Sequence, residues 1–159
     1  MSKILHARRL KPAQFDKAFA LIQFAFRQVS LDRWRRHVEA FDGRQDDDAG
    51  WLAVEDDKGY IHGLLAYRIE SDLICGRILT GRDIILGGVA LGQTISCAIA
   101  GLSRMARRTR CDAIHIALPG YEDDDLDCGV TGMKACLLRA GYVDRGSHLC
   151  RCLCGRCKR

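Results

Sequence analysis

Residues 82–118 decide the fold and read RDIILGGVALGQTISCAIAGLSRMARRTRCDAIHIAL. The segment holds an apolar run, a short glycine-containing turn, an amphipathic stretch of about four helical turns and a second apolar run. This order predicts a strand, a helix and a second strand, with the strands parallel and joined by a right-handed crossover. The start of such a helix presents backbone N–H groups at its positive end, so the segment predicts a site for an anionic ligand.

Length and composition indicate one globular domain. The chain has 159 residues, of which 48% are hydrophobic and 28% are charged. It has no apolar run of the roughly eighteen residues that a membrane span needs, so we expect no membrane association. Residues 1–12 contain no continuous hydrophobic segment typical of a signal peptide, and we therefore expect a cytoplasmic protein.

The distribution of charge suggests two kinds of ligand. The net charge of +5 is too modest to indicate nucleic acid by itself. Arginines cluster at residues 33–36 and 104–110, whereas acids cluster at residues 46–48 and 122–125. This separation suits an anionic cofactor at one place and a cationic substrate at another, although solvated surface faces have the same composition.

The rest of the chain predicts strands and helices around the central crossover. We expect a strand at 4–10, helices at 12–29 and 30–41, strands at 51–55, 61–70 and 77–86, a strand at 114–118, a last helix ending near 140 and a hairpin at 142–144 and 148–153. The fold class is therefore α/β with a mixed sheet: antiparallel strands, one parallel crossover and about four helices. One domain spans residues 1–153, and a Cys- and Arg-rich tail spans residues 154–159.

This order of elements resembles the GNAT N-acetyltransferase superfamily over nearly the whole chain. The family pattern at the central helix is Arg or Gln, Gly, any residue, Gly, an apolar residue, and Gly or Ala; residues 91–96 read LGQTIS at these positions. Residues 138–142, LRAGY, resemble the end of the family's last helix and its following aromatic residue. The resemblance implies acetyl-CoA or another acyl-CoA as co-substrate.

The resemblance also implies which residues contact coenzyme A, mainly through backbone amides. The positions are Gly88, Val89, Leu91, Gly92, Gln93, Thr94, Ile95 and Ser96. Gly92 allows a phosphate to approach closely, and the two hydroxyl residues can cap the helix or contact an anion. Leu91, Thr94 and Ser96 depart from the family pattern, which favours weaker binding or an altered pose.

Direct acyl transfer to an amine needs a base, and three side chains are candidates. Asp83 and Glu70 lie on central strands, and His115 lies on the strand after the crossover. Asp83 is the best placed, whereas an exposed Glu70 and a buried structural His115 are the competing interpretations. The tyrosine that serves as general acid in the family falls on Leu137, and Tyr142 is expected in the core, so no acid for the leaving thiolate can be named.

Four cysteines crowd the C-terminal end. Cys150, Cys152, Cys154 and Cys157 follow His148 closely enough to form a single zinc site. We favour a reduced tail without metal, because structural zinc usually joins two separated cysteine pairs. The other five cysteines are expected to behave as small buried hydrophobes in a reducing compartment.

Three functions remain open at this point. The first is an acyl-CoA-dependent N-acyltransferase acting on an amine of a small cationic molecule, and the second is a catalytically inactive binding or regulatory domain of the same fold. The third is metal or nucleic-acid binding through the tail, which is the weakest because the tail has no aromatic residue for base stacking. A homodimer formed through the C-terminal strands is compatible with the resemblance.

Overall fold

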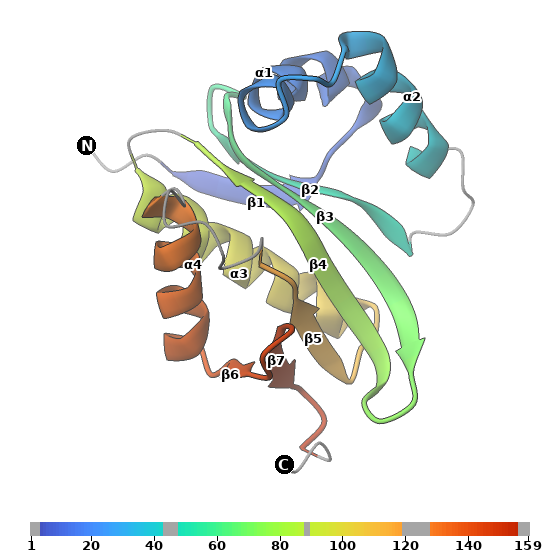
Figure 1. Ribbon diagram of the computed structural model, residues 1–159, viewed down its shortest axis with the longest axis vertical. Coiled ribbons are helices and arrows are strands. Elements are labelled where there is room, and N and C mark those ends of the chain that lie inside the picture. The colour runs from blue at the N-terminus through green and yellow to red at the C-terminus, as the bar shows by residue number, and fades with distance from the viewer. Residues whose placement is uncertain (1–3, 43–47, 88–89, 119–127, 156–159) are drawn as a thin grey trace.

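The computed structural model describes residues 4–42, 48–87, 90–118 and 128–155, which form a mixed α/β domain (Figure 1). Its strands are β1 (Leu5–Arg9), β2 (Ala49–Asp56), β3 (Ile61–Asp72), β4 (Gly76–Leu86), β5 (Ala113–Ile116), β6 (Val143–Asp144) and β7 (Leu149–Cys152). Its helices are the 3-10 turn η1 (Pro12–Gln14) and the α-helices α1 (Phe15–Ala25), α2 (Leu31–Asp42), α3 (Leu91–Arg108) and α4 (Cys128–Arg139).

The sheet confirms the predicted fold class. Its seven strands have the order β1-β2-β3-β4-β5-β7-β6. β4 and β5 pair in parallel through the crossover helix α3, and the other pairs are antiparallel. The expected terminal hairpin is present, with β7 inserted between β5 and β6.

The first predicted helix is shorter than expected at both ends. The side chain of Gln14 accepts a hydrogen bond from the backbone amide of Lys11 at 3.0 Å, and Pro12 therefore begins a separate 3-10 turn rather than α1. α1 ends because Phe26 adopts φ −130° and ψ 79°, outside the helical region. Val29 consequently lies in the connection between α1 and α2 instead of on a helix face.

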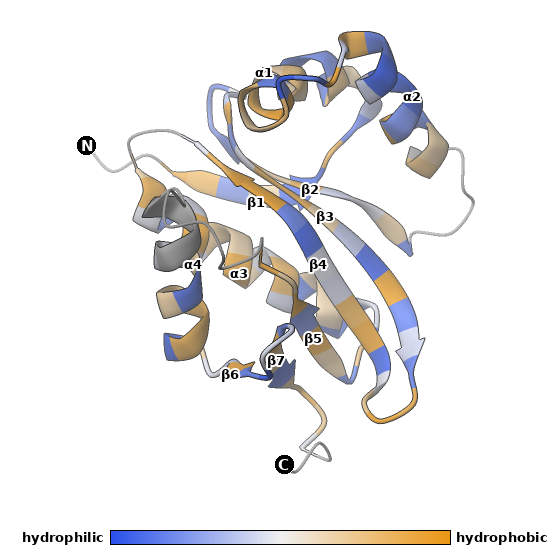
Figure 2. Ribbon diagram, in the orientation of Figure 1, coloured by the Kyte–Doolittle hydropathy of each residue, from blue (hydrophilic) through white to orange (hydrophobic). Residues whose placement is uncertain are grey.

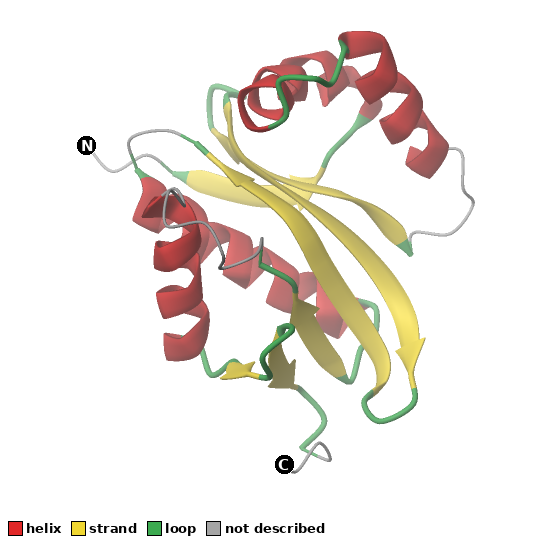
Figure 3. Ribbon diagram, in the orientation of Figure 1, coloured by secondary structure: helices red, strands yellow, loops and turns green. Residues whose placement is uncertain are grey.

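Helices cover the two faces of the sheet with separate apolar cores (Figure 2). α1 and α2 pack on one face, and α3 and α4 pack on the other (Figure 3). The larger core lies under α3 and includes fully buried Leu102, Ile114 and Ile116. The second core lies under α1 and α2, around buried Trp34 and Trp51. The crossover helix α3 covers one face, and α1 and α2, which connect β1 to β2, cover the other.

β4 separates from β5 partway along its length. The register pairs Ile78 with Ala113 and Gly81 with Ile116, and the amide of Ala117 then donates to the carbonyl of Gly81 at 2.9 Å. Among the described residues, no pairing with β5 continues from Arg82 to the end of β4. The carboxyl half of β4 therefore leaves an opening beside β5.

A bulge in β4 begins at the point of separation. Leu64 and Ala66 of β3 pair with Ile85 and Arg82, so β4 holds one residue more than β3 over this interval. Asp83 lies inside the bulge with φ +51°, in the left-handed region that few residues other than glycine adopt. A bulge bends its strand and increases the local twist, which accounts for the departure of β4 from β5.

The first turn of α3 rests directly on β3. A Cβ added to Gly63 would lie 3.0 Å from Cγ2 of Thr94 and 3.3 Å from Cδ2 of Leu86. Glycine at this position allows the helix start and the sheet to approach each other closely. The orientation of the amides at the start of α3 is therefore set by packing against the sheet.

A buried carboxylate organises the β2–β3 turn beside this junction. Asp56 is 6% exposed, and its Oδ1 accepts hydrogen bonds from the amides of Lys58 and Tyr60 at 3.0 and 3.1 Å. Its Oδ2 lies 2.9 Å from Nε2 of His62. The carbonyl of His62 in turn accepts a hydrogen bond from the amide of Gly87 at 2.8 Å. The turn is thus linked through β3 to the segment that leads into α3.

We predict that Asp56 stabilises the fold in a defined pH range. The hydrogen bond from His62, followed by those from the two amides, lowers the pKa of Asp56 from 3.8 to about 2. This stabilisation is complete above pH 4 and is lost as the pH falls toward 2, because the native carboxylate must then be protonated. Asp56→Asn should therefore lower the urea midpoint near neutral pH, and the difference from wild type should narrow toward pH 2.

The control for this prediction is the same substitution at Asp57, an exposed neighbour that lies 2.9 Å from His6. Asp57→Asn should retain the acid dependence of the wild-type midpoint. A difference between wild type and Asp56→Asn that stays constant across the range would contradict the assigned role of Asp56.

Candidate functional site

The start of α3 is open to solvent and presents backbone amides. The amide of Thr94 makes the first hydrogen bond within the helix, to the carbonyl of Ala90 at 3.0 Å. The amides of Leu91 and Gly92 precede that bond and project from the helix end, which has no side-chain cap. A Cβ on Gly92 would meet nothing within 4 Å among the described residues. The positive helix end can therefore receive an anionic group.

Two of the predicted cofactor residues face the core instead. Thr94 is 1% exposed, and its hydroxyl donates to the carbonyl of Ala90 at 3.1 Å. Ile95 is 2% exposed within the apolar core. The prediction that the Thr94 hydroxyl contacts an anion is therefore wrong, because the hydroxyl already bonds within its own helix. The Ile95 side chain anchors the helix to the sheet.

The other predicted positions divide into accessible and undescribed ones. Gln93 and Ser96 are exposed at the start of α3, and Leu91 is half-buried against the core. Gly88 and Val89 lie outside the described residues. The described part of the predicted cofactor site thus consists of the first helical amides and two exposed polar side chains.

A pocket of about 230 Å³ lies between α1, α2 and the bulged part of β4. Most of its wall is apolar, and three charged or titratable side chains reach it. Its lining residues are Ile22, Phe26, Val29, Arg33, Trp34, His37, Trp51 and Asp83. We call it the acceptor pocket. Because β4 separates from β5 at the same level, the pocket and the opening lie beside the same strand segment.

Aromatic rings surround His37 at the mouth of the acceptor pocket. Its ring centroid lies 6.2 Å from that of Trp34, 6.0 Å from that of Trp51 and 4.9 Å from that of Phe41. Trp34 is held in place because its Nε1 donates to the carbonyl of Phe15 at 2.7 Å. Rings in this arrangement offer negatively polarised faces, and such faces favour organic cations.

The electrostatics of the pocket keep His37 neutral near pH 7. Desolvation is the largest effect and lowers the pKa of His37 below its ordinary value of 6.5. The Asp83 carboxylate acts in the opposite direction, and the Arg33 guanidinium lowers the pKa further. A neutral imidazole with an exposed edge can accept a proton from a bound ammonium group.

A buried donor completes the polar inventory of the pocket. Trp51 is 6% exposed, and its Nε1 has no hydrogen-bond partner among the described residues. Buried N–H groups are nearly always paired in folded proteins. Trp51 also lines the pocket, so a residue of the pocket wall carries this unpaired buried donor.

The three predicted base candidates occupy different places. Asp83 lines the acceptor pocket. Glu70 is exposed on β3 opposite Ile78, and His115 stacks on His148 with ring centroids 4.4 Å apart. Neither Glu70 nor His115 lines the acceptor pocket. The structure therefore brings together Asp83 and His37, which the sequence reasoning missed.

A signal for His37 was present in the sequence. Trp34, His37 and Phe41 recur at helical steps of three and four along α2. A histidine among aromatic residues on one helix face is a candidate site residue. Recognising it requires knowing which part of the sheet that helix face packs against. The covering strand residue, Trp51, lies 14 positions further along the chain.

The predicted core position of Tyr142 is confirmed, and Leu137 lies in the same core. Leu137 is fully buried and Tyr142 is 3% exposed, both within the core under α3. Burial raises the pKa of Tyr142 to about 12. Tyr142 is therefore a neutral packing residue, and it does not line the acceptor pocket.

A larger cavity of about 490 Å³ lies elsewhere, between β1 and the carboxyl half of α3. Cations dominate its rim, including Arg8, Lys11, Arg104 and Arg108. It is bounded by Gly101 and later residues of α3, so it is separate from the amides at the helix start.

The comparisons with known proteins identify the fold. No family model matches the chain, and no curated protein matches it by sequence. By structure, 158 solved chains match. A variant of the spermidine N-acetyltransferase from Vibrio cholerae is 14% identical, with a TM-score of 0.67 over 98% of this chain and 97% of that one.

Two of the matching structures contain coenzyme A or its acetyl ester. An aminoglycoside N-acetyltransferase in complex with coenzyme A is 13% identical, with a TM-score of 0.65 over 91% of each chain. A GNAT family acetyltransferase from Brucella melitensis in complex with acetyl-CoA is 16% identical, with a TM-score of 0.56 over 96% of this chain and 90% of that one. The fold is therefore that of the GNAT acetyltransferases, as the sequence resemblance suggested. Of the helices described, none has the length and apolar character needed to cross a bilayer.

We predict opposite effects of two substitutions on His37. Asp83→Asn removes the carboxylate that raises the pKa of His37, so this pKa should fall, whereas Arg33→Gln should raise it. Asparagine tolerates the left-handed backbone at position 83, so the bulge should be retained. NMR titration of the His37 ring protons measures both shifts. A change of the His37 pKa in the same direction in both variants would contradict the assigned effects of Asp83 and Arg33.

Proposed function

We propose that this protein is an acyl-CoA-dependent N-acyltransferase that transfers an acetyl group to an amine of a small cationic molecule. The observation that carries the proposal is the placement of the acceptor pocket beside the part of β4 that has left β5, with the open start of α3 following that strand. A donor at the helix start and an acceptor in the pocket would approach each other from opposite sides of the opening.

The donor end is suited to the pyrophosphate of coenzyme A. Amides at the start of α3 attract phosphate oxygens, and the unobstructed space above Gly92 lets a ligand approach. The carboxyl half of β4 offers backbone groups that β5 does not use. Such groups can hydrogen-bond the amides of the pantetheine arm in the manner of an added strand. The complexes of structural neighbours with coenzyme A and acetyl-CoA support this choice of donor.

The acceptor end is suited to an organic cation. Asp83 supplies a negative charge at the wall, and the rings of Trp34 and Trp51 supply faces that favour a cation. Neighbours with the same fold include a spermidine and an aminoglycoside N-acetyltransferase, both named for amine substrates. The small volume of the pocket favours binding of one amine-bearing arm of a substrate.

The chemistry requires removal of a proton from the bound ammonium group before it attacks the thioester. In our proposal Asp83 holds the ammonium group and neutral His37 accepts its proton, because the two side chains meet in one pocket. The free amine then attacks the acyl carbon, the carbon–sulfur bond breaks, and coenzyme A leaves as a thiolate that takes up the proton released by the new amide nitrogen. No covalent intermediate with the protein is required.

A specific observation favours a second candidate function, that of an inactive binding domain. Leu137 is fully buried at the position where the family places its tyrosine acid. Among the described residues that line the acceptor pocket, none is a tyrosine or cysteine. Binding of acetyl-CoA without turnover over a panel of amines would favour this second function over acyl transfer.

We predict that Gly92→Trp abolishes binding of acetyl-CoA without unfolding the protein. The added side chain enters open space and covers the helix amides. At a ligand concentration of 100 Kd, acetyl-CoA should stabilise wild type by about 2.7 kcal/mol, or about 5–10 °C in a thermal unfolding experiment. Ala100→Trp, on an exposed face of α3, is the control and should keep the full shift. An equal rise in unfolding temperature with acetyl-CoA in both variants would contradict binding of the donor at the start of α3.

We also predict that His37→Gln lowers kcat by about 10²- to 10⁴-fold and removes the acidic limb of the pH–rate profile. In wild type the rate should rise as His37 loses its proton, at a pH below its ordinary pKa of 6.5. Product formation is best followed by mass spectrometry, because nine cysteines interfere with thiol-release dyes. His6→Gln, outside the pocket, is the control. An unchanged profile in His37→Gln would assign the base elsewhere.

A further inference from the structure

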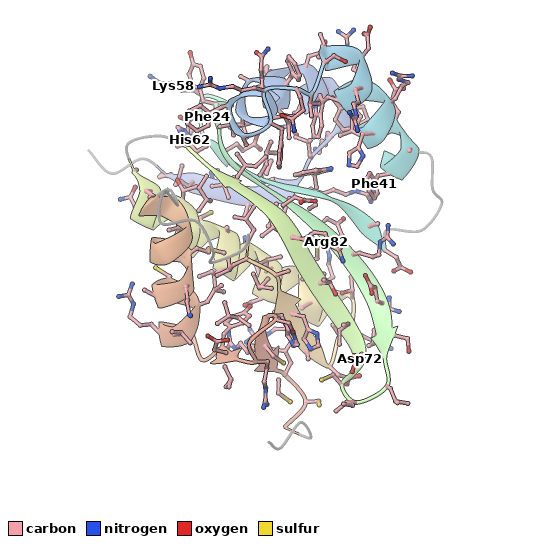
Figure 4. All side chains as sticks on the ribbon, viewed as in Figure 1. Phe24, Phe41, Lys58, His62, Asp72 and Arg82 are labelled. Atoms are coloured by element: carbon pink, nitrogen blue, oxygen red, sulfur yellow. The ribbon has the colours of Figure 1, made fainter. Side chains whose placement is uncertain are left out.

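Three metal-ligating side chains meet at the end of the sheet away from α1 and α2. Cys75 lies in the turn between β3 and β4, His115 lies on β5, and Cys150 lies on β7. One ligand atom from each, two sulfurs and a ring nitrogen, lie within 4.8 Å of one another. Figure 4 shows Asp72, at the start of this turn, at the opposite end of β3 from His62.

The sheet register brings these residues together from distant parts of the chain. His115 pairs directly with Cys150 across β5 and β7, and Ile78 pairs with Ala113 across β4 and β5. Ile78, Ala113 and Cys150 form a small buried cluster against which Cys75 packs. The site is thus built on two paired strands and the turn that leads into a third, which hold the ligands more rigidly than a terminal tail would.

We propose that Cys75, His115 and Cys150 bind a zinc ion. Thiolate and imidazole ligands select zinc among the common divalent ions, and three protein ligands with a water molecule form an accepted tetrahedral set. Bond lengths of about 2.3 Å to sulfur and about 2.0 Å to nitrogen place the ligand atoms roughly 3.6–3.8 Å apart. The three ligand atoms lie within 4.8 Å of one another, so side-chain movements of about an ångström would bring them to these distances.

An unpaired nitrogen of His115 also favours a metal ion at this site. Nε2 of His115 is buried and has no hydrogen-bond partner among the described residues. A buried polar atom without a partner costs free energy, and a metal ion would satisfy it. A disulfide between Cys75 and Cys150 would leave this nitrogen unpaired, so the three groups together favour a metal over oxidation.

The surroundings hold two of the ligands in place. Oδ1 of Asp72 accepts hydrogen bonds from the amides of Cys75 and Ile74 at 2.7 and 2.9 Å, which fixes the turn. The ring of His148 stacks on that of His115 and limits its rotation. Partners of this kind orient metal ligands and raise affinity.

The site differs from the tail chelate, which the sequence offered only as the less favoured alternative to a reduced tail without metal. Cys150 joins Cys75 and His115, whereas Sγ of Cys152 lies 3.7 Å from Sγ of Cys154. Cys157 lies outside the described residues. The proposed zinc site therefore uses two residues on β5 and β7 and one in the β3–β4 turn, instead of four neighbouring cysteines.

Metal content of the full chain tests the proposal. Protein is saturated with zinc chloride, dialysed into metal-free buffer and analysed for zinc. Wild type should retain about one zinc per chain, and Cys75→Ser or His115→Gln should retain less than about a tenth of that. The double variant Cys154→Ser, Cys157→Ser and the helix α4 variant Cys136→Ser are controls that should bind as wild type does. Circular dichroism verifies that each variant is folded.

A second readout identifies the ligands. Cobalt(II) substituted into wild type should give the intense visible bands of a tetrahedral site and a thiolate charge-transfer band, and Cys75→Ser should lose both. Acetyl transfer by Cys75→Ser should equal that of wild type, because the turn is separate from the acceptor pocket. Absence of zinc from saturated wild type, retention of zinc by Cys75→Ser, or its loss from the tail double variant would each overturn the proposal.

Discussion

The separation of β4 from β5 is the constraint on which the rest of the structure depends. β5 pairs with β4 over all four of its residues, Ala113–Ile116, and the carboxyl half of β4 continues past it without a β5 partner among the described residues. The cause is local: one extra residue in β4 and the left-handed backbone of Asp83 bend the strand. The unpaired half of the strand then borders both the start of α3 and the acceptor pocket.

The bulge performs a second task in the same few residues. Besides bending β4, it turns the Asp83 carboxylate toward α2, where it meets His37 and Arg33. In a regular strand successive side chains alternate between the two faces, so the direction of the Asp83 side chain would be fixed by that alternation. The backbone strain at Asp83 is therefore linked to the charge that the acceptor pocket contains, which is the usual setting for a strained residue at a functional site.

Much of the fold was predictable from local patterns. The apolar runs and the amphipathic stretch around α3 define the crossover, and the parallel pair follows from its length. The helix ends were less predictable, because Gln14 and Phe26 end or shift helical segments through individual hydrogen bonds and backbone angles. The Thr94 hydroxyl was misjudged for a similar reason: its orientation depends on how closely α3 packs on Gly63.

The sites were harder to predict because their members come together only through sheet register. Asp83 was a candidate from its place before the cofactor segment, but His37 belongs to α2 and lies 46 positions earlier in the chain, with β2 and β3 between them. Cys75, His115 and Cys150 are separated by 40 and 35 positions in the chain, so no spacing motif exists for them. The four tail cysteines offered such a motif and drew attention away from the residues that meet in space.

The two halves of the candidate site come from different parts of the chain, and this has an evolutionary consequence. The helix start that we propose to bind phosphate belongs to residues 91–96, whereas most of the acceptor pocket wall belongs to the contiguous segment 22–37. Under the proposed function, substitutions in that short segment would change which amine is accepted while leaving the donor end untouched. Specificity would then be modular, and exchanging the two N-terminal helices between proteins of this fold would be a direct way to redesign it.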